Sequence, residues 1–492
     1  MLYSLIDRLI EIMVSNELLN PMDTLYVRNR LLAQFNEANY EVSPAISGDL
    51  YTTLDALIAL AVEKNLVSDN LAEQDIFASN LMNIFLDKPS VINATFFEKY
   101  KESPQTATDY FYQLSQLNNY IKVTRIAKNK EYTTTSPYGP IQVTINLSKP
   151  EKDPKQIALE KSMPSTNYPP CLLCVENEGY EGTIKHPDRA NHRMIRLHMN
   201  HKDWMMQYSP YLYYNEHCII LSTSHTPMQI TKDTFANLLD FTAQFPHYFI
   251  GSNADLPIVG GSILSHEHYQ GGRNTFPMDH ATTLCNFNLT NYPTIKGALI
   301  NWPLSTIELR STDVESLVNC SQEILELWKG YSDPACEILA FSDETPHNTI
   351  TPICKRDGED YVMRLVLRNN RTSEAHPLGI FHPHADVHHI KKENIGLIEV
   401  MGLAILPGRL LTELEEVKAY VKGDATEVPE YHKLWADTLA TNYTADLDID
   451  AYVIQALGDK FTRVLEDAGV YKLDDAGIAG FKRFITQFAT IC

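Results

Sequence analysis

The chain has 492 residues, of which 44% are hydrophobic and 21% charged, and its formal net charge is −21. This composition is typical of a folded globular protein, and the length suffices for one large domain or two to three ordinary ones. So acidic a chain is poorly suited to nucleic acids or anionic membranes, because clustered lysines and arginines bind phosphate groups. An anionic small-molecule substrate would need a local positive site, a metal ion or backbone N–H groups.

The N-terminal sequence MLYSLIDRLIEIM does not predict a secretory signal, since Asp7, Arg8 and Glu11 interrupt its apolar residues. Uninterrupted apolar runs such as Leu57–Val62 are far too short to span a bilayer. Eight cysteines in a chain of this length do not indicate a disulfide framework, so we expect a reducing, cytoplasmic compartment. Paired cysteines then suggest a metal site before a disulfide.

Hydrophobic periodicity divides the chain into three parts. Helical spacing, as at Leu5 and Leu9, predicts a helical N-terminal region from 1 to 125. From 126 to 405, strand-like alternation such as that of Ile141 and Val143 mixes with turns and helical stretches, which predicts an α+β domain. Helical spacing returns from 406 to 492, with a last helix expected over 476–488. A His-x-His pair occurs at 266–268 and again at 382–384, which suggests an internal duplication.

The stretch from Gly260 to Arg273 is the richest in reactive side chains. On a strand, His266, His268 and Gln270 would face the same side, and three polar groups on one face need a cavity or a partner. The flanking glycines would let a ligand approach the backbone and would present N–H groups to an oxyanion, while Arg273 would add a positive charge. An isolated His-x-His is weak evidence, but the whole string predicts an active site.

Cys171 and Cys174 form a Cys-x-x-Cys pair, which is a common half of a tetrahedral zinc site. A redox pair and two unrelated buried cysteines are the alternatives, although a thioredoxin-like strand-to-helix setting is lacking. Two further ligands are needed, and His225 and His266 are the candidates. For His225 the alternative is a loop histidine with ordinary hydrogen bonds.

A third group of histidines gathers near the end of the α+β region. It comprises His347, His382 and His384, with Asp386, His388 and His389 nearby. Such a group fits a second metal site or a site for a substrate phosphate. It fits equally well a polar segment whose histidines make structural hydrogen bonds.

Taken together, these segments resemble the galactose-1-phosphate uridylyltransferase family, in particular its second, bacterial type with a helical N-terminal extension, within the histidine-triad superfamily. The resemblance covers nearly the whole chain. It rests on the segments 146–154, 171–179, 260–273, Phe381-His-Pro-His384 and 393–402, in that order. It implies a duplicated antiparallel-sheet core, with a first half over 126–300 and a second over 301–405. It also implies a homodimer, because histidine-triad relatives commonly pair.

The resemblance also implies roles for individual residues. The first type of the family carries His-Pro-His-x-Gln, in which the second histidine takes the uridylyl group, so His268 would be the nucleophile here, with Glu267 replacing the proline. The implied zinc ligands are Cys171, Cys174, His225 and His266. A second metal, iron in the first type, would correspond to Asp279, His347, His382 and His384. The substrate contacts that we expect are Asn253, Gly260, Gly261, Ser262, Gly271, Gly272, Arg273 and Lys149.

The implied reaction moves a uridylyl group from UDP-glucose to galactose 1-phosphate through His268. Superfamily members that hydrolyse phosphoramidates carry a third histidine where this chain has Gln270, because their amine leaving group needs an acid. A sugar phosphate leaves as a stable anion, so glutamine favours transfer between phosphates. Two alternatives stay open: another nucleotidyltransferase or phosphorylase with the same core, and a zinc-stabilised binding module without catalysis.

Overall fold

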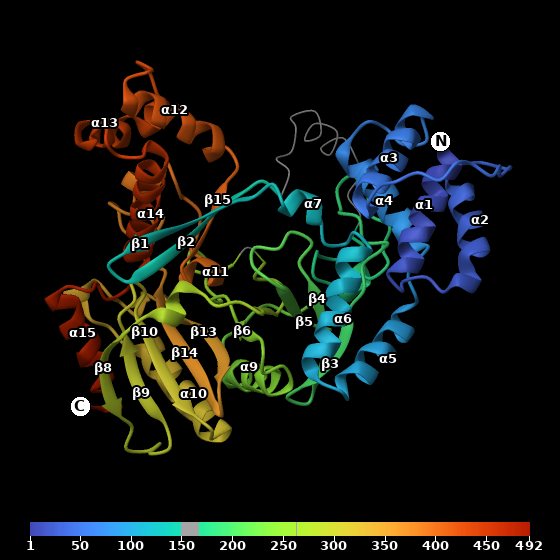
Figure 1. Ribbon diagram of the computed structural model, residues 1–492. Helices are drawn as coiled ribbons and strands as arrows, with labels where there is room; N and C mark the ends of the chain where they lie inside the picture. The colour runs from blue at the N-terminus through green and yellow to red at the C-terminus, as the bar shows by residue number, and fades with distance from the viewer. Residues whose placement is uncertain (149–166, 262) are drawn as a thin grey trace.

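The computed structural model describes residues 1–148, 167–261 and 263–492 (Figure 1). Two residues with a predicted substrate role, Lys149 and Ser262, lie outside the described residues. In the parts of the chain that are described, no helix is both long enough and apolar enough to cross a membrane.

The N-terminal region is helical, as predicted. Its helices are α1 (Leu2–Ser15), α2 (Thr24–Gln34), α3 (Leu50–Glu63), α4 (Leu71–Asn83), α5 (Pro89–Tyr100), α6 (Pro104–Leu117) and α7 (Val123–Ile126). The apolar stripe of α1 is its buried face, and Leu9 is fully buried there in a core shared with α2, α3 and α4. Side-chain caps start several of these helices; Asp49, for example, accepts a hydrogen bond from the Thr52 N–H.

A small sheet follows, consisting of the antiparallel hairpin β1 (Lys130–Ser136) and β2 (Gly139–Asn146) with β15 (Leu403–Pro407) parallel to β2. The alternation predicted for this segment is real, since Ile141, Val143 and Ile145 are buried. The hairpin therefore joins residues near the start of the α+β region to residues near its end.

The large sheet has eleven strands among the described residues, in the order β16-β8-β9-β10-β14-β13-β6-β7-β5-β4-β3. In chain order these are β3 (Ile195–Met199), β4 (Lys202–Tyr208), β5 (Cys218–Ser222), β6 (Phe249–Gly251), β7 (His268–Gly272), β8 (Thr283–Asn288), β9 (Lys296–Ile300), β10 (Thr306–Ser311), β13 (Asn348–Asp357), β14 (Asp360–Asn369) and β16 (Thr490–Ile491). Helices α9 (Lys232–Gln244) and α10 (Val314–Gly330) contact each other and the central strands (Figure 1).

The sheet is built from two copies of one arrangement. The first copy runs through β3, β4, β5, α9, β6 and β7, and the second through β8, β9, β10, α10, β13 and β14. The strand order is the same in both, and the copies meet where β6 pairs antiparallel with β13. This confirms the duplicated antiparallel core. The junction between the copies falls within 273–282, earlier than the expected boundary at 300–301.

The two His-x-His pairs are not equivalent positions of this duplication. His268 begins β7, whose counterpart in the second copy is β14. His382 and His384 lie beyond the end of β14. The duplication is therefore real, but the repeated His-x-His pair that suggested the duplication does not arise from it.

The opposite side of the sheet carries a second core. Phe249, Ile353 and Val366 of the sheet pack there with the apolar faces of the C-terminal helices. The helices of this core are α11 (Leu397–Val400), α12 (Leu410–Lys422), α13 (Lys433–Asn442) and α14 (Ile449–Ala468). The last helix, α15 (Asp475–Ile485), packs instead in the core on the α10 side, where Phe484 contacts Trp328. The C-terminal region is helical as predicted, except that β16 pairs with β8 at the sheet edge.

Short elements complete the chain. They are the hairpin β11 (Phe341–Ser342) with β12 (Thr345–Pro346), and the 3₁₀ turns η1 (Pro21–Asp23), η2 (Val175–Asn177), η3 (Pro277–His280), η4 (Pro334–Cys336), η5 (Ala385–Val387) and η6 (Glu430–His432).

Candidate active site and metal centre

His268 occupies the first position of β7 and is buried, with 6% of its surface exposed. Its Nδ1 lies 2.8 Å from the carbonyl oxygen of His266, and since a carbonyl only accepts, Nδ1 carries the proton. Nε2 is then the bare nitrogen, and it makes no hydrogen bond to any residue that the structure describes. Burial lowers the pKa of His268 to about 4, which favours the neutral, nucleophilic imidazole.

His266 faces the other way and has the opposite tautomer. Its Nε2 donates to the carbonyl oxygen of Ser222 at 2.8 Å, which leaves Nδ1 with a lone pair. That Nδ1 lies 3.3 Å from Sγ of Cys171 and 3.7 Å from Sγ of Cys174. The two histidines of the pair therefore have different partners: Nδ1 of His266 lies beside the cysteine sulfurs, and Nδ1 of His268 bonds to a backbone carbonyl.

The four predicted zinc ligands form one cluster. Their ligand atoms all lie within 4.8 Å of one another, with His225 Nδ1 3.0 Å from Cys174 Sγ. Two cysteine sulfurs and two imidazole nitrogens at these separations suit a tetrahedral Zn²⁺ ion. The Ser222 carbonyl that orients His266 is the kind of outer contact that fixes a metal-binding histidine.

The loop that carries the cysteines has a support that the sequence did not reveal. Asn177 is fully buried, and its Nδ2 donates to the carbonyls of both Cys171 and Cys174 at 2.8 Å. The Nε2 of His186 lies 2.6 Å from Oδ1 of Asn177. The position of Asn177, three residues after Cys174, is the only local signal that could have suggested it.

Gln270 is held by a histidine from the neighbouring strand region. His217 directly precedes β5, and its Nε2 lies 3.2 Å from Oε1 of Gln270. Because an amide oxygen accepts, His217 donates through Nε2, and its buried Nδ1 has no hydrogen-bond partner among the described residues. Burial lowers the pKa of His217 to about 4, so it is neutral. The amide N–H₂ of Gln270 is thereby turned away from His217 and left for a ligand.

His217 was missed in the sequence because it belongs to no motif. It lies between Glu216 and Cys218, 53 residues from its partner. The rings of Tyr214 and Tyr213 lie 4.5 and 5.6 Å from its ring and cover it. Only strand pairing brings it to Gln270, since Cys218 pairs with Gly271.

The flanking glycines serve close packing of the protein with itself. A Cβ on Gly260 would lie 2.5 Å from the carbonyl oxygen of Ala254, and one on Gly271 would lie 2.8 Å from that of Phe249. Gly272 has φ +149°, and its Cβ would meet the Glu216 carbonyl at 2.6 Å. These contacts differ from the expected close approach of a ligand.

Asn253 and Gly261 lie together at the start of the α11 segment. A Cβ on Gly261 would come within 2.6 Å of Nδ2 of Asn253, and Oδ1 of Asn253 accepts from the N–H of Leu397 at 2.9 Å. The Leu397 side chain would meet a Cβ on Gly251, which pairs with Gln270 in the sheet. Asn253 therefore anchors the 393–397 segment beside β7.

Arg273 does not present a free charge to the site. Its guanidinium pairs with the buried carboxylate of Glu216 and, at 3.0 Å, with Asp109 of α6. Two carboxylates from distant parts of the chain bind the cation, so it is not the unpaired charge that the sequence suggested, and its contact with a phosphate stays a prediction.

The predicted second metal group does not assemble. Among the described residues, the group around Cys171 is the one whose ligand atoms come close enough to share an ion. Asp279 is instead paired with Lys355 at 2.5 Å and with Arg364 at 2.6 Å. His347 bonds to Asn370 and Ser342, and His384 to the Ile380 carbonyl. The histidines make structural hydrogen bonds, and the carboxylate is neutralised by cations.

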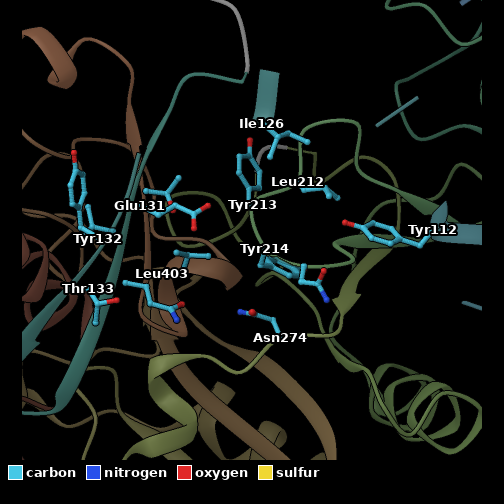
Figure 2. Close-up of a pocket in the computed structure, with 14 residues that line it drawn as sticks. Tyr112, Ile126, Glu131, Tyr132, Thr133, Leu212, Tyr213, Tyr214, Asn274 and Leu403 are labelled. Atoms are coloured by element: carbon cyan, nitrogen blue, oxygen red, sulfur yellow. The ribbon is translucent and has the colours of Figure 1, made fainter. Parts of the chain in front are cut away.

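A cavity of about 490 Å³ lies next to the pair formed by His217 and Gln270, because Tyr213 and Tyr214 line it (Figure 2). Figure 2 shows its side chains arriving from β1 on one side and from the loop before β5 on the other. Glu131 and Asn274 contribute a carboxylate and an amide. This lining of carboxylate, amides and aromatic rings suits a polyhydroxylated ligand.

A second cavity, of about 460 Å³, shares Tyr213 with the first and includes Leu172 of the cysteine loop. Lys122 and Arg189 line it, and Lys122 Nζ donates to Asp188 at 3.0 Å. The Arg189 guanidinium lies 5.6 Å from the centre of the Tyr120 ring. The two cavities therefore share Tyr213, and the second is lined by cations and aromatic rings together with the carboxylates of Asp75 and Asp188.

A duplicated antiparallel sheet with His268 and Gln270 on strand β7, and with His266 just before it in a Cys₂His₂ cluster that could hold a metal, defines a histidine-triad-like protein. Comparison with known sequences specifies the family. The model of "Galactose-1-phosphate uridyl transferase, N-terminal domain" matches residues 17–227, and that of the C-terminal domain matches 241–437. The chain belongs to the galactose-1-phosphate uridylyltransferase family.

Individual relatives agree with this assignment. A galactose-1-phosphate uridylyltransferase of Clostridium perfringens is 55% identical, over 98% of this chain and 98% of its own. One from Ligilactobacillus salivarius is 49% identical, over 99% of both chains. Among solved structures, yeast Ap4A phosphorylase Apa2 covers 68% of this chain and 97% of its own, with 13% identity and a TM-score of 0.31, which is too low to add to the assignment.

Proposed function

We propose that this chain is a UDP-glucose—hexose-1-phosphate uridylyltransferase, which moves UMP from UDP-glucose to galactose 1-phosphate through a covalent uridylyl group on His268. The observation that carries the proposal is the tautomer of His268. With Nδ1–H bound to the His266 carbonyl, Nε2 is the nitrogen that remains for attack. Family membership and the names of the relatives support the choice of substrates.

In the first half-reaction, Nε2 of His268 attacks the α-phosphorus of UDP-glucose. The bond from that phosphorus to the bridging oxygen breaks, and glucose 1-phosphate leaves with the electron pair as a stable anion. The leaving group needs no proton, which agrees with the absence of a titrating acid at position 270. The imidazolium formed is stabilised through Nδ1–H and the His266 carbonyl.

Gln270 stabilises the charge that develops on the phosphoryl oxygens. His217 fixes the amide by donating to its oxygen, so the N–H₂ group faces the ligand. A donor held in place before the reaction stabilises the transition state without the cost of reorganisation.

In the second half-reaction, a phosphate oxygen of galactose 1-phosphate attacks the same phosphorus, and the bond to Nε2 of His268 breaks. The uridylyl group stays in place throughout, and only the sugar phosphates exchange. We assign the nucleotide to the cationic, aromatic cavity around Tyr120 and Arg189 and the hexose to the cavity of Figure 2. The shared wall at Tyr213 fits a substrate whose two parts lie on either side of the reacting phosphorus.

We further propose that the metal is zinc and that its role is structural. The ion would be held by Cys171, Cys174, His225 and His266. Bound zinc would fix the segment that leads into β7, where His268 lies. We also propose a cytoplasmic homodimer, on the grounds of the eight free cysteines and the pairing common in histidine-triad relatives. Light scattering after gel filtration tests the dimer.

The experiment for the function is intact-protein mass spectrometry after incubation with UDP-glucose and removal of free nucleotide. We expect one uridylyl group per chain and release of a matching amount of glucose 1-phosphate. Adding galactose 1-phosphate should remove the adduct and yield UDP-galactose. If inorganic phosphate removes the uridylyl group as efficiently as galactose 1-phosphate does, the protein is a phosphorylase. If the protein catalyses the transfer but never carries the uridylyl group, the covalent route is rejected.

A further inference from the structure

The C-terminal helices line a cavity of about 1140 Å³, which is larger than either of the two cavities that share Tyr213. It lies between the segment 385–389, the start of α12, and helices α13 and α14. This segment follows the histidine pair at 382–384, which the transfer mechanism does not use. The volume is slightly above the range of small-molecule sites, about 300–1,000 Å³.

One wall of the cavity is cationic, in a chain with a net charge of −21. Arg409, Lys460 and Arg463 line it. Asp386 and Asp459 line it too, so three cations stand against two carboxylates. Arg409 and Arg463 are also paired with Glu413 and Asp467, so Lys460 is the cation of this wall that has no carboxylate partner among the described residues.

The two guanidinium groups are held in place with donors to spare. Arg409 pairs with Glu413 at 2.5 Å and donates to the His389 carbonyl at 3.1 Å, and Arg463 pairs with Asp467 at 2.9 Å. A guanidinium has five N–H donors, so each keeps donors for a ligand. Lys460 makes one long contact, 3.4 Å to the Asp386 carbonyl.

A chain of hydrogen bonds reaches His389 in the cavity wall. Nε2 of the fully buried His432 lies 2.9 Å from Oε2 of Glu413, and its Nδ1 lies 2.8 Å from Nδ1 of His389. The carboxylate accepts, so His432 donates through Nε2 and accepts at Nδ1. His389 must then donate through Nδ1, and its Nε2 is a lone pair. That atom is buried and has no hydrogen-bond partner among the described residues.

The facing wall is apolar and aromatic. Leu434 and Leu439 line it together with Trp435, whose ring lies 5.3 Å from that of His389. Leu434 is 83% exposed and Tyr431 is 56% exposed, which is high for large apolar side chains. Such a wall would be covered by the flat face of an aromatic ligand.

We propose that this cavity is a second ligand site, for a nucleoside monophosphate, separate from the transfer site. The phosphate lies against Lys460 and Arg463, and the base covers Trp435 and Leu434. A phosphorylated sugar could pair with the cations but would leave the apolar wall exposed to solvent. A nucleotide therefore fits the cavity better than a sugar phosphate does.

Tryptophan fluorescence isolates this site, because Trp204, Trp302 and Trp328 are fully buried and line none of the three cavities, whereas Trp435 lines this one. We expect UMP or AMP to change the emission of the full-length protein saturably, and Trp435→Phe to abolish the change. Uridine should bind at least about tenfold more weakly, since it lacks charge-assisted hydrogen bonds. Inorganic phosphate and glucose 1-phosphate should give no such change.

Lys460→Gln should weaken the nucleotide response about tenfold while the melting temperature and the transfer rate without added UMP stay at wild-type values. Lys422→Gln, at the exposed end of α12, is the matched control and should leave the response unchanged. The absence of a saturable response to either nucleotide, or equal affinity in Lys460→Gln and the wild type, would overturn the proposal. A response to glucose 1-phosphate as strong as that to UMP would overturn the choice of a nucleotide.

Discussion

The Nδ1 atom of His268 lies 2.8 Å from the carbonyl oxygen of His266, so the backbone of one histidine in the His-x-His pair sets the tautomer of the other. His266 is in turn oriented by the Ser222 carbonyl and the two cysteines. The proposed metal site and the proposed nucleophile are thus joined through His266, so a substitution at either one should affect the other.

His268→Ala should abolish both the release of glucose 1-phosphate and turnover, because no other nitrogen occupies the end of β7. Initial-rate plots of the wild type against both substrates should give parallel lines, as a covalent intermediate requires. His198→Ala, at an exposed histidine of β3, should behave as the wild type. Intersecting lines together with undiminished turnover in His268→Ala would favour direct transfer in a ternary complex.

Gln270→Ala should slow both half-reactions by about 10²–10³, by analogy with oxyanion-hole donors. His217→Ala should slow them by roughly 5–10-fold, since the amide is present but no longer fixed. In the Gln270→Ala background, removing His217 should have almost no further effect, and the double-mutant cycle measures this coupling in single-turnover rates. Additive losses would show that His217 acts only through overall stability.

Cys171→Ser should lower bound zinc and the melting temperature together, because one of four ligands is lost. Elemental analysis of unchelated protein should find about one zinc per wild-type chain. Cys285→Ser, at a half-buried cysteine of β8 outside the cluster, should retain the metal. Wild-type protein with far less than one zinc per chain would contradict the assignment.

Stability should fall as the pH drops from 6.5 toward 4. Burial lowers the pKa of His217 to about 4 and that of His192 well below its ordinary value, so the unfolded chain binds more protons in this window. The stabilisation is therefore present above pH 6.5 and is lost on acidification, with His217 accounting for roughly 2 kcal/mol by pH 5. In melting curves between pH 7.5 and 5, His217→Asn should show a smaller slope than the wild type, and the exposed-site variant His198→Gln an unchanged one.

Much of this protein follows from local sequence patterns. Periods of two and of three to four residues predicted the strand at Ile141 and Val143 and the buried faces of α1 and α12. The Cys-x-x-Cys spacing and the His-x-His pair pointed to candidate metal ligands, and the fold brings Cys171, Cys174, His225 and His266 together. Which nitrogen of each histidine carries the proton depends on the Ser222 and His266 carbonyls, and that needed the fold.

Tertiary structure decided what charges and histidines do when their partners are distant in the chain. Arg273 looks free in the sequence, but Glu216 and Asp109 bind it; Asp279 looks like a metal ligand, but Lys355 and Arg364 neutralise it. His217 belongs to no motif and reaches Gln270 only because β5 pairs with β7. Sequence periodicity records which face of an element is buried, whereas a hydrogen bond or an ion pair depends on strand register and packing between segments that only the folded chain brings together.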